Sequence, residues 1–409
     1  MDTRTHAFVP VPGGVLAPSG FSAGAVAAGI KRSGAIDVCV LDAGAPVPAA
    51  AVFTRNTMAA PPVAVSREAH ADGRLRAWVV NAGNANACTG APGRADARAM
   101  AERAAGTLGC DPADVGVAST GVIGVPLPMN AVREGIVAAV ASRGSTTGHA
   151  AAAAAAIMTT DTFAKEAAYS GTVEGITYTV GGMAKGSGMI HPDMATMLAF
   201  VTTDAPLTSR ACAEVLARAT ASTFNRITVD GDTSTNDTCA LMASGAAGGG
   251  PIDVDDPRLS ALADAVTLVC ADLARMIVRD GEGATKLVEV TVRGAATETD
   301  AEAAARAIAV SPLVKTALFG GDANWGRVAM AIGNSGALLD PERVEIVFAG
   351  ITTCRAGRAL PFSEEEAAVA LAREEVDVTV DLHLGAATAT VLTCDLSYEY
   401  VRINGDYRT

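Results

Sequence analysis

Strand-like and helix-like segments follow one another along this chain without the regular strand–helix–strand alternation of a doubly wound sheet. Short apolar runs between turn residues predict buried strands, as at Arg76–Val80. Apolar residues at helical spacing predict helices, as at 94–108. Because the two kinds of segment do not alternate strictly, we expect a layered α+β fold in which helices cover sheets.

The same patterns predict the remaining elements. Further strands are expected over 36–41, 50–53, 115–118, 173–180 (split by Gly175 and ended by Gly181 and Gly182), 197–202, 287–292 and 344–348, with a hairpin of 376–384 and 389–396 that turns at Gly385. Further helices are expected over 150–156, after a cap at Thr208 or Ser209, and over 258–278 and 300–309.

The core must be built from small side chains packed closely. Half of the 409 residues are apolar, but only 4% are aromatic, and Ala, Val and Gly are abundant. A chain of this length can bury a substantial core, shared between two lobes. The run of seven alanines at 150–156 fits this composition, and we expect it to be a helix lying close against a sheet.

Charge and cysteine usage exclude several classes of function. The net charge of -13 and the absence of a basic patch argue against nucleic-acid binding, which needs a concentrated positive surface. The eight cysteines are scattered without a CxxC pair, which is typical of reduced thiols rather than of a disulfide framework or a zinc site. The chain start lacks a secretion signal and no apolar run reaches ~18 residues, so we expect a cytoplasmic protein without a membrane span.

The segment from Gly181 to Phe200 carries the most informative chemistry. A Gly/Ser loop containing Lys185 leads through a proline to Thr196, which opens an apolar strand. If the Thr196 hydroxyl attacks the carbonyl of Ala195, the acyl group shifts from nitrogen to oxygen and water releases a chain that begins at Thr196. The new α-amino group, with a pKa near ~8, is then a general base for the hydroxyl of the same residue. From this local pattern alone, an ordinary β-branched residue at a strand start is the simpler interpretation.

Other local patterns are less specific. Ser119–Gly121 follows a predicted strand and, taken alone, is a strand-to-helix turn with a helix cap. Gly281–Lys286 lacks the spacing of a phosphate-binding loop, 280–283 lacks the remaining ligands of a calcium loop, and His191 belongs to no HExxH motif. Residues 185–189 do not have the frame of a GxSxG nucleophile turn. We therefore expect no metal site.

Ordered motifs recur along nearly the whole chain, at 20–31, 81–90, 119–124, 158–162, 185–198, 225–237, 280–286, 321–327 and 400–409. The most specific is Lys185-Gly-Ser-Gly-Met-Ile190 followed by Met194-Ala-Thr-Met-Leu198. In this order they resemble the motifs of the ornithine acetyltransferase family, the self-cleaving glutamate N-acetyltransferases of the arginine pathway.

The resemblance implies an architecture and an assembly. It implies an αββα-type sandwich with a smaller C-terminal α/β lobe, with a main lobe at about 8–286 and a C-terminal lobe at about 287–409. It also implies cleavage into an alpha chain, 1–195, and a beta chain, 196–409, which stay together as a heterotetramer of two alpha and two beta chains.

The resemblance further implies a reaction. An acetyl group would move from N-acetylornithine to Thr196, ornithine would leave, and glutamate would attack the acetyl-enzyme to give N-acetylglutamate. No cofactor is implied, but acetyl-CoA is a candidate second acetyl donor. The family motifs assign the oxyanion hole to Thr120 and Gly121, and substrate binding to Thr159, Lys185, Thr196, Glu282, Asn404 and Thr409.

Two alternatives remain open at this point. An N-terminal-nucleophile amidase or aminopeptidase would use the same Thr196 with water as the acceptor. An uncleaved binding protein on the same fold would use no nucleophile at all.

Overall fold

One long strand organises the main lobe of the structure, a computed structural model that describes residues 8–191 and 197–406. This strand, β3 (Val38–Phe53), pairs with β2 (Ser22–Val26) and β4 (Arg74–Asn84) through its first part and with β9 (Thr238–Ala243) through its last part. Its pairing with β4 shifts register between Asp42 and Val47. The two strands expected at 36–41 and 50–53 are therefore one strand, interrupted by an irregularity instead of a turn.

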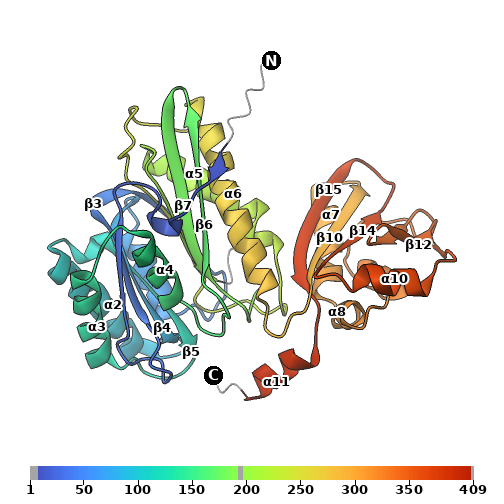
Figure 1. The fold of residues 1–409 in the computed structure, drawn as a ribbon, viewed down its shortest axis with the longest axis horizontal. Helices are drawn as coiled ribbons and strands as arrows, with labels where there is room; N and C mark the ends of the chain where they lie inside the picture. The colour runs from blue at the N-terminus through green and yellow to red at the C-terminus, as the bar shows by residue number, and fades with distance from the viewer. Residues whose placement is uncertain (1–7, 192–196, 407–409) are drawn as a thin grey trace.

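The other strands extend this sheet on both sides (Figure 1). In the described residues the sheet has nine strands, in the order β1-β6-β7-β8-β9-β3-β4-β5, with β2 beside β3. The added strands are β1 (Val9–Pro10), β5 (Val115–Val122), β6 (Lys165–Val173), β7 (Ile176–Lys185) and β8 (Leu198–Thr203).

Because β3 passes from one half of this sheet to the other, the two halves face each other across an inner core. Trp78 from β4 and Phe200 from β8 meet there, with ring centroids 5.3 Å apart. The outer face of the β7–β9 half is covered by α5 (Ser209–Ser222) and α6 (Arg258–Arg279), and the outer face of the β3–β5 half by α2 (Gly90–Leu108) and α3 (Met129–Ala141). The predicted αββα-type sandwich is confirmed.

Two further helices complete the main lobe. Helix α1 (Pro61–Ala69) packs on β5, and α4 (Thr147–Ala156) packs on β2. The alanines of α4 that point inward are fully buried, so the predicted close approach of the alanine run to a sheet is confirmed.

A second sheet forms the C-terminal lobe. Its six strands lie in the order β13-β12-β11-β14-β10-β15 around a separate core. The strands are β10 (Leu287–Ala295), β11 (Glu345–Phe348), β12 (Ile351–Arg355), β13 (Arg358–Ala359), β14 (Glu375–Asp381) and β15 (Ala387–Cys394), and the helices are α7 (Glu298–Val310), α8 (Pro312–Phe319), α9 (Trp325–Gly333) and α10 (Glu364–Leu371).

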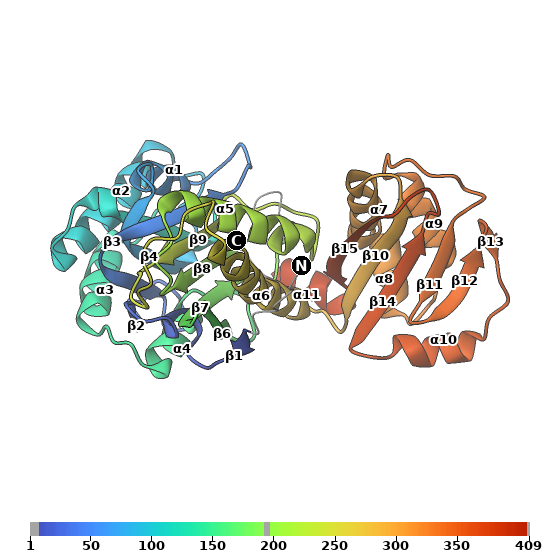
Figure 2. The ribbon, with the colours of Figure 1, turned by 90° about the horizontal axis from the view of Figure 1, so that it is seen from above.

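The last described helix, α11 (Tyr398–Asp406), leaves this second sheet and runs beside the main lobe, as Figures 1 and 2 both show. Of the helices in the described ranges, none has the length and apolar character needed to cross a bilayer.

Two sequence-based predictions about strands are wrong. The predicted break of 173–180 at Gly175 is confirmed, because β6 and β7 form a hairpin at Glu174 and Gly175, whose positive φ angles of 49° and 82° suit a tight two-residue turn. The predicted end at Gly181 and Gly182 is wrong, because β7 continues through both glycines to Lys185. The segments 376–384 and 389–396 do not form a hairpin, because β10 lies between β14 and β15. Gly385 lies in the connection from β14 to β15, which passes close to the end of β10. Glycine is needed there because a Cβ would lie 2.4 Å from the Ala295 carbonyl oxygen.

Candidate active site

A cavity of about 110 Å³ lies where the ends of several main-lobe strands meet the loops that follow them. Six of the residues predicted from the family motifs line it: Thr120, Gly121, Thr159, Lys185, Glu282 and Asn404. These residues come from places far apart in the sequence, so the fold itself brings them together. Ala195, Thr196 and Thr409 lie outside the described residues, but Met197 and Leu198 line the same cavity.

Thr120 and Gly121 lie near the end of β5, which continues through Val122 and not only to 118 as predicted. Gly121 has a φ of +130°, and a Cβ on it would lie 2.4 Å from the Gly83 carbonyl carbon in the neighbouring β4. Only glycine permits that close approach of the two strands. The predicted interpretation as a helix-capping turn is therefore wrong for these two residues.

A buried amide, Asn236, fixes the backbone next to this pair. Its Nδ2 donates to the carbonyl oxygens of Ala85 (2.6 Å) and Ser119 (2.9 Å). The Ser119 hydroxyl donates to Asn81 Oδ1 at 2.6 Å. The end of β5 is thus held by side-chain hydrogen bonds as well as by its strand pairing, which gives any donor at Thr120 or Gly121 a fixed direction.

Lys185 is the last residue of β7 and pairs with Leu198 of β8, so the prediction that it lies in a flexible loop is wrong. Its side chain is only 8% exposed. No hydrogen bond or ion pair joins its ammonium group to another residue in the described part of the chain. Burial lowers the pKa of Lys185, and the charge of Asp161 opposes that shift. A buried ammonium without a direct partner on the wall of a cavity is suited to receive an anionic group of a ligand.

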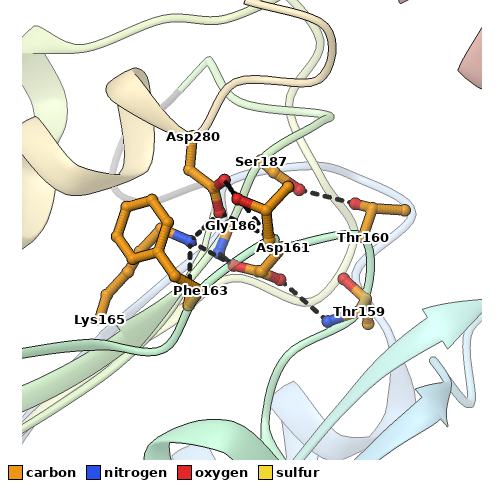
Figure 3. Close-up of polar contacts among 9 residues, drawn as sticks. Thr159, Thr160, Asp161, Phe163, Lys165, Gly186, Ser187 and Asp280 are labelled. Carbon is orange, nitrogen blue, oxygen red and sulfur yellow. Dashed lines mark hydrogen bonds and ion pairs between the residues drawn. The ribbon is translucent and has the colours of Figure 1, made fainter.

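Next to Lys185 lies a buried ion cluster, which we define as Asp161, Lys165 and Asp280 (Figure 3). Lys165 Nζ lies 2.7 Å from Asp161 Oδ1 and 2.6 Å from Asp280 Oδ2, and all three side chains are almost completely buried. Burial disfavours the charge of Asp161, but the ammonium groups of Lys185 and Lys165 outweigh it and hold the pKa of this carboxyl well below its usual range.

This buried ion cluster joins three segments that line the cavity. Asp161 accepts from the backbone N–H of Thr159 (2.9 Å) and of Gly186 (2.6 Å). Asp280 accepts from the N–H of Thr162 at 3.0 Å. The loop after α4, the end of β7 and the loop after α6 are therefore fixed relative to one another.

Glu282 lies in the Gly-rich loop after α6, as predicted. Its backbone N–H donates to the Ser187 carbonyl oxygen at 2.9 Å. Its carboxylate lies so close to Gly188 that a Cβ on that residue would be 2.4 Å from Glu282 Cδ. From α11, Asn404 Nδ2 donates to Glu282 Oε2 at 2.8 Å, so the C-terminal helix reaches the cavity.

Asp230 links the C-terminal helix to the loop that precedes residue 192. Its carboxylate accepts from the backbone N–H groups of Met189 (2.5 Å) and Ile190 (2.9 Å). The Tyr400 hydroxyl of α11 lies 3.4 Å from the same carboxylate. Burial raises the pKa of the Asp230 carboxyl.

The chemistry of the cavity is that of a binding site for a small zwitterion. A buried ammonium (Lys185) and a carboxylate (Glu282) both line it, together with the hydroxyls of Thr120 and Thr159. Opposite charges at separate positions suit a ligand that carries both a carboxylate and an amine. Within the described residues, no group of three or more His, Cys, Asp or Glu side chains is arranged to hold a metal ion.

Comparison with known proteins decides the family. The model of the ArgJ family matches residues 22–409. The arginine biosynthesis bifunctional protein ArgJ of Symbiobacterium thermophilum is 54% identical over 399 residues, covering 97% of this chain and 99% of that protein. The chain belongs to the ArgJ family. The ArgJ protein of Thermus thermophilus is 51% identical over 395 residues, covering 96% of this chain and 99% of its own length.

A solved ArgJ structure is also similar. The crystal structure of the arginine biosynthesis bifunctional protein argJ from Bacillus halodurans is 47% identical, with a TM-score of 0.50, and covers 51% of this chain and 98% of that chain. The predicted family, and with it the enzyme class of a glutamate N-acetyltransferase, is confirmed by membership in the ArgJ family.

Several residues that shape this ArgJ-family site were missed by sequence reasoning. Asp161, Asp230 and Asp280 fall inside the quoted motifs, and Lys165 lies just after one, but none was assigned a role. The signal that would have found them is the presence of charged residues inside otherwise apolar or Gly-rich motifs, because buried charges must be paired.

Proposed function

We propose that this ArgJ-family chain cleaves itself between Ala195 and Thr196 and then transfers an acetyl group from N-acetylornithine to glutamate through Thr196. The observation that carries the proposal is that Met197 and Leu198 line the same cavity as Gly121, Lys185 and Glu282. Thr196 directly precedes Met197 in the sequence, and this adjacency supports the proposal that it acts at that cavity.

In the proposed first half-reaction, the Thr196 hydroxyl attacks the acetyl carbonyl of N-acetylornithine, and the Thr196 α-amino group accepts the hydroxyl proton. Donors at Thr120 and Gly121 would stabilise the tetrahedral oxyanion, a contribution of about 3–4 kcal/mol per donor in other enzymes. The C–N bond then breaks, the proton passes to the leaving amine, and ornithine departs from an acetyl-Thr196 ester.

In the second half-reaction, the amine of glutamate attacks that ester, and the Thr196 oxygen leaves and recovers its proton. N-acetylglutamate and free enzyme result, so the acetyl group is conserved. Lys185 would bind a substrate carboxylate, Glu282 with Asn404 a substrate amine, and Thr159 the acylated end of the substrate. Thr409 is proposed as a further substrate contact because it closes the last family motif.

The length of the Bacillus halodurans chain supports self-cleavage. That chain is covered over 98% of its length but matches only 51% of this chain, so it is about half as long. The Symbiobacterium and Thermus relatives, by contrast, extend over almost the full length of this chain. A half-length chain is what cleavage between 195 and 196 would produce.

Intact-mass analysis tests the cleavage directly. We expect the purified protein to give two species, residues 1–195 and 196–409, and Thr196→Ala to give a single uncut chain without transferase activity. The matched control is Thr299→Ala on the exposed face of α7, which should be cut like the native protein. A native chain that stays whole on prolonged incubation would contradict the proposal.

The molecule that accepts the acetyl group distinguishes a transferase from the amidase alternative. Ornithine release from N-acetylornithine should depend on added glutamate and should be matched mole for mole by N-acetylglutamate. Release that proceeds equally well without glutamate would mean that water is the acceptor.

We also propose acetyl-CoA as a second acetyl donor, because the Symbiobacterium and Thermus relatives are named bifunctional proteins. Formation of N-acetylglutamate from acetyl-CoA and glutamate, absent in Thr196→Ala, would support this second activity. Its absence in a preparation that uses N-acetylornithine would restrict the enzyme to one donor.

The proposed assembly is a cytoplasmic heterotetramer of two alpha and two beta chains, without nucleic-acid or membrane partners. Light scattering after size exclusion should give a particle with twice the mass of the 41.0 kDa chain. A particle with the mass of one chain would contradict the tetramer without affecting the proposed chemistry.

A further inference from the structure

The buried ion cluster of Asp161, Lys165 and Asp280 contains more negative than positive charge. One ammonium lies between two carboxylates, and each of the three side chains is at most 2% exposed to solvent. An unbalanced buried charge is costly unless another group of opposite sign compensates it. The arrangement therefore calls for a second cation nearby.

Lys185 is placed to be that cation. Asp161 Oδ1, which contacts Lys165, also accepts from the N–H of Gly186, the residue directly after Lys185. Lys185 is itself buried and makes no ion pair with another described residue. The charged groups that act most strongly on it come from several elements: Asp161, Lys165, Asp237 and Glu282, with Lys31 also close enough to interact.

We propose that Asp161 is a positioning residue that keeps Lys185 in the ammonium form on the cavity wall, while Lys165 and Asp280 hold the Asp161 carboxylate in place. The inference rests on the proposed function, in which Lys185 binds a substrate carboxylate. The inference also gives the buried ion cluster a purpose. The excess negative charge of the cluster offsets the free-energy cost of burying the Lys185 ammonium, which is proposed to bind the ligand.

The consequence for Lys185 follows from the sign of the charge. Burial lowers the pKa of Lys185, and Asp161 raises it. Removal of the Asp161 charge should therefore let Lys185 lose its proton at lower pH. A shift of one unit is a tenfold change in the fraction of free amine at a pH below the midpoint.

Asp280 offers a matched control. It makes the same kind of ion pair with Lys165, but it is not among the charges that act most strongly on Lys185. Asp161→Asn and Asp280→Asn each remove one negative charge from the same buried ion cluster, so a purely structural effect should appear in both. Only Asp161→Asn should change the protonation of Lys185 strongly.

The test measures this protonation directly. The full-length native protein and each variant are pulsed with acetic anhydride at a series of pH values, and acetylation of Lys185 is quantified by peptide mass mapping. We expect the labelling midpoint of Lys185 to fall by about one unit in Asp161→Asn, and by much less in Asp280→Asn. An unchanged midpoint in Asp161→Asn, or an equal shift in both variants, would overturn the proposal.

A charge-preserving variant covers the case in which Asp161→Asn does not fold. Asp161→Glu retains the carboxylate, so its Lys185 midpoint should match that of the native protein. A fall of a full unit in Asp161→Glu would mean that packing and not charge governs Lys185, and would also overturn the proposal.

Activity measurements then connect the inference to the reaction. In Asp161→Asn, the fall of kcat/KM at alkaline pH should begin at lower pH than in the native protein. This fall should come from a rise in KM, and kcat at low pH should change little. The labelling result does not depend on turnover, so a native protein without transferase activity would refute the proposed function and leave the test of Asp161 intact.

Discussion

The replacement of Lys165 by methionine tests the energetic account of the buried ion cluster. Methionine has a similar length and no charge, so Lys165→Met leaves the Asp161 and Asp280 carboxylates buried without their shared cation. Removal of one partner of a buried ion pair typically costs about 3–5 kcal/mol. Loss of the contact between Lys165 Nζ and the Phe163 ring, 4.9 Å from its centroid, adds about 1–2 kcal/mol.

The assay is urea unfolding followed by intrinsic fluorescence, with Arg98→Met as the control. Arg98 pairs with Glu68 on the surface, where both side chains are more than half exposed. Exposed pairs contribute about 0–1 kcal/mol. We therefore expect a large fall in the unfolding midpoint for Lys165→Met and almost none for Arg98→Met.

The dependence on pH supplies a second check. In the native protein the pKa of Asp161 is depressed, so its stabilising contribution is present above the unfolded pKa of about 3.9 and is lost as the pH falls below it. Without Lys165 the buried Asp161 carboxylate binds a proton more readily, so the deficit of the variant should shrink between pH 7 and pH 5. A loss below about 1 kcal/mol at pH 7, or a deficit that grows as the pH falls, would refute the reasoning.

Three other substitutions probe the end of the cavity where Thr120 and Gly121 are proposed to form the oxyanion hole. Thr120→Val should lower kcat by about 10²–10³-fold with KM little changed, if the hydroxyl donates to the oxyanion; steady-state kinetics decide this. Gly121→Ala should cost at least about 1–3 kcal/mol, since its Cβ would collide with the Gly83 backbone, whereas Gly124→Ala, with open space around its Cβ, should cost less in the same thermal melt. Asn236→Ala removes the donor of two buried carbonyls and should cost about 1–3 kcal/mol in urea unfolding, with a lowered kcat; an unchanged midpoint would contradict its positioning role.

Local patterns were sufficient wherever neighbours in sequence determine the structure. The predicted helices at 94–108 and 258–278 correspond to α2 and α6, whose buried residues recur at helical spacing. The family motifs predict Thr120, Gly121, Lys185 and Glu282 at one site, and these four residues line one cavity in the structure. Their chemical roles remain predictions.

Long-range pairing is what sequence reasoning could not supply. One partner of Lys165, Asp161, is four residues away, but the other, Asp280, is 115 residues away, and that pairing cannot be read from the neighbouring sequence. The error at 376–396 has the same origin: both segments are strands, but only the position of β10 decides that they do not pair with each other. Hydrophobic periodicity and residue propensity predict that a segment is a strand or a helix. Which strands pair with it depends on the whole chain.

The order of strands in the main sheet has a consequence for when the chain can be cut. Strands β8 and β9, which follow residue 196, lie between β7 and β3, which precede it. Neither piece alone could complete this sheet, since each would expose unpaired strand edges. In the uncleaved chain, β7 and β8 pair within one molecule, but after the proposed cleavage the same pairing would need two molecules to meet. If the chain is cleaved as proposed, folding must therefore come first. The cleaved protein, once unfolded, should then regain its structure only in a concentration-dependent step, so that its persistence is set by how slowly it unfolds.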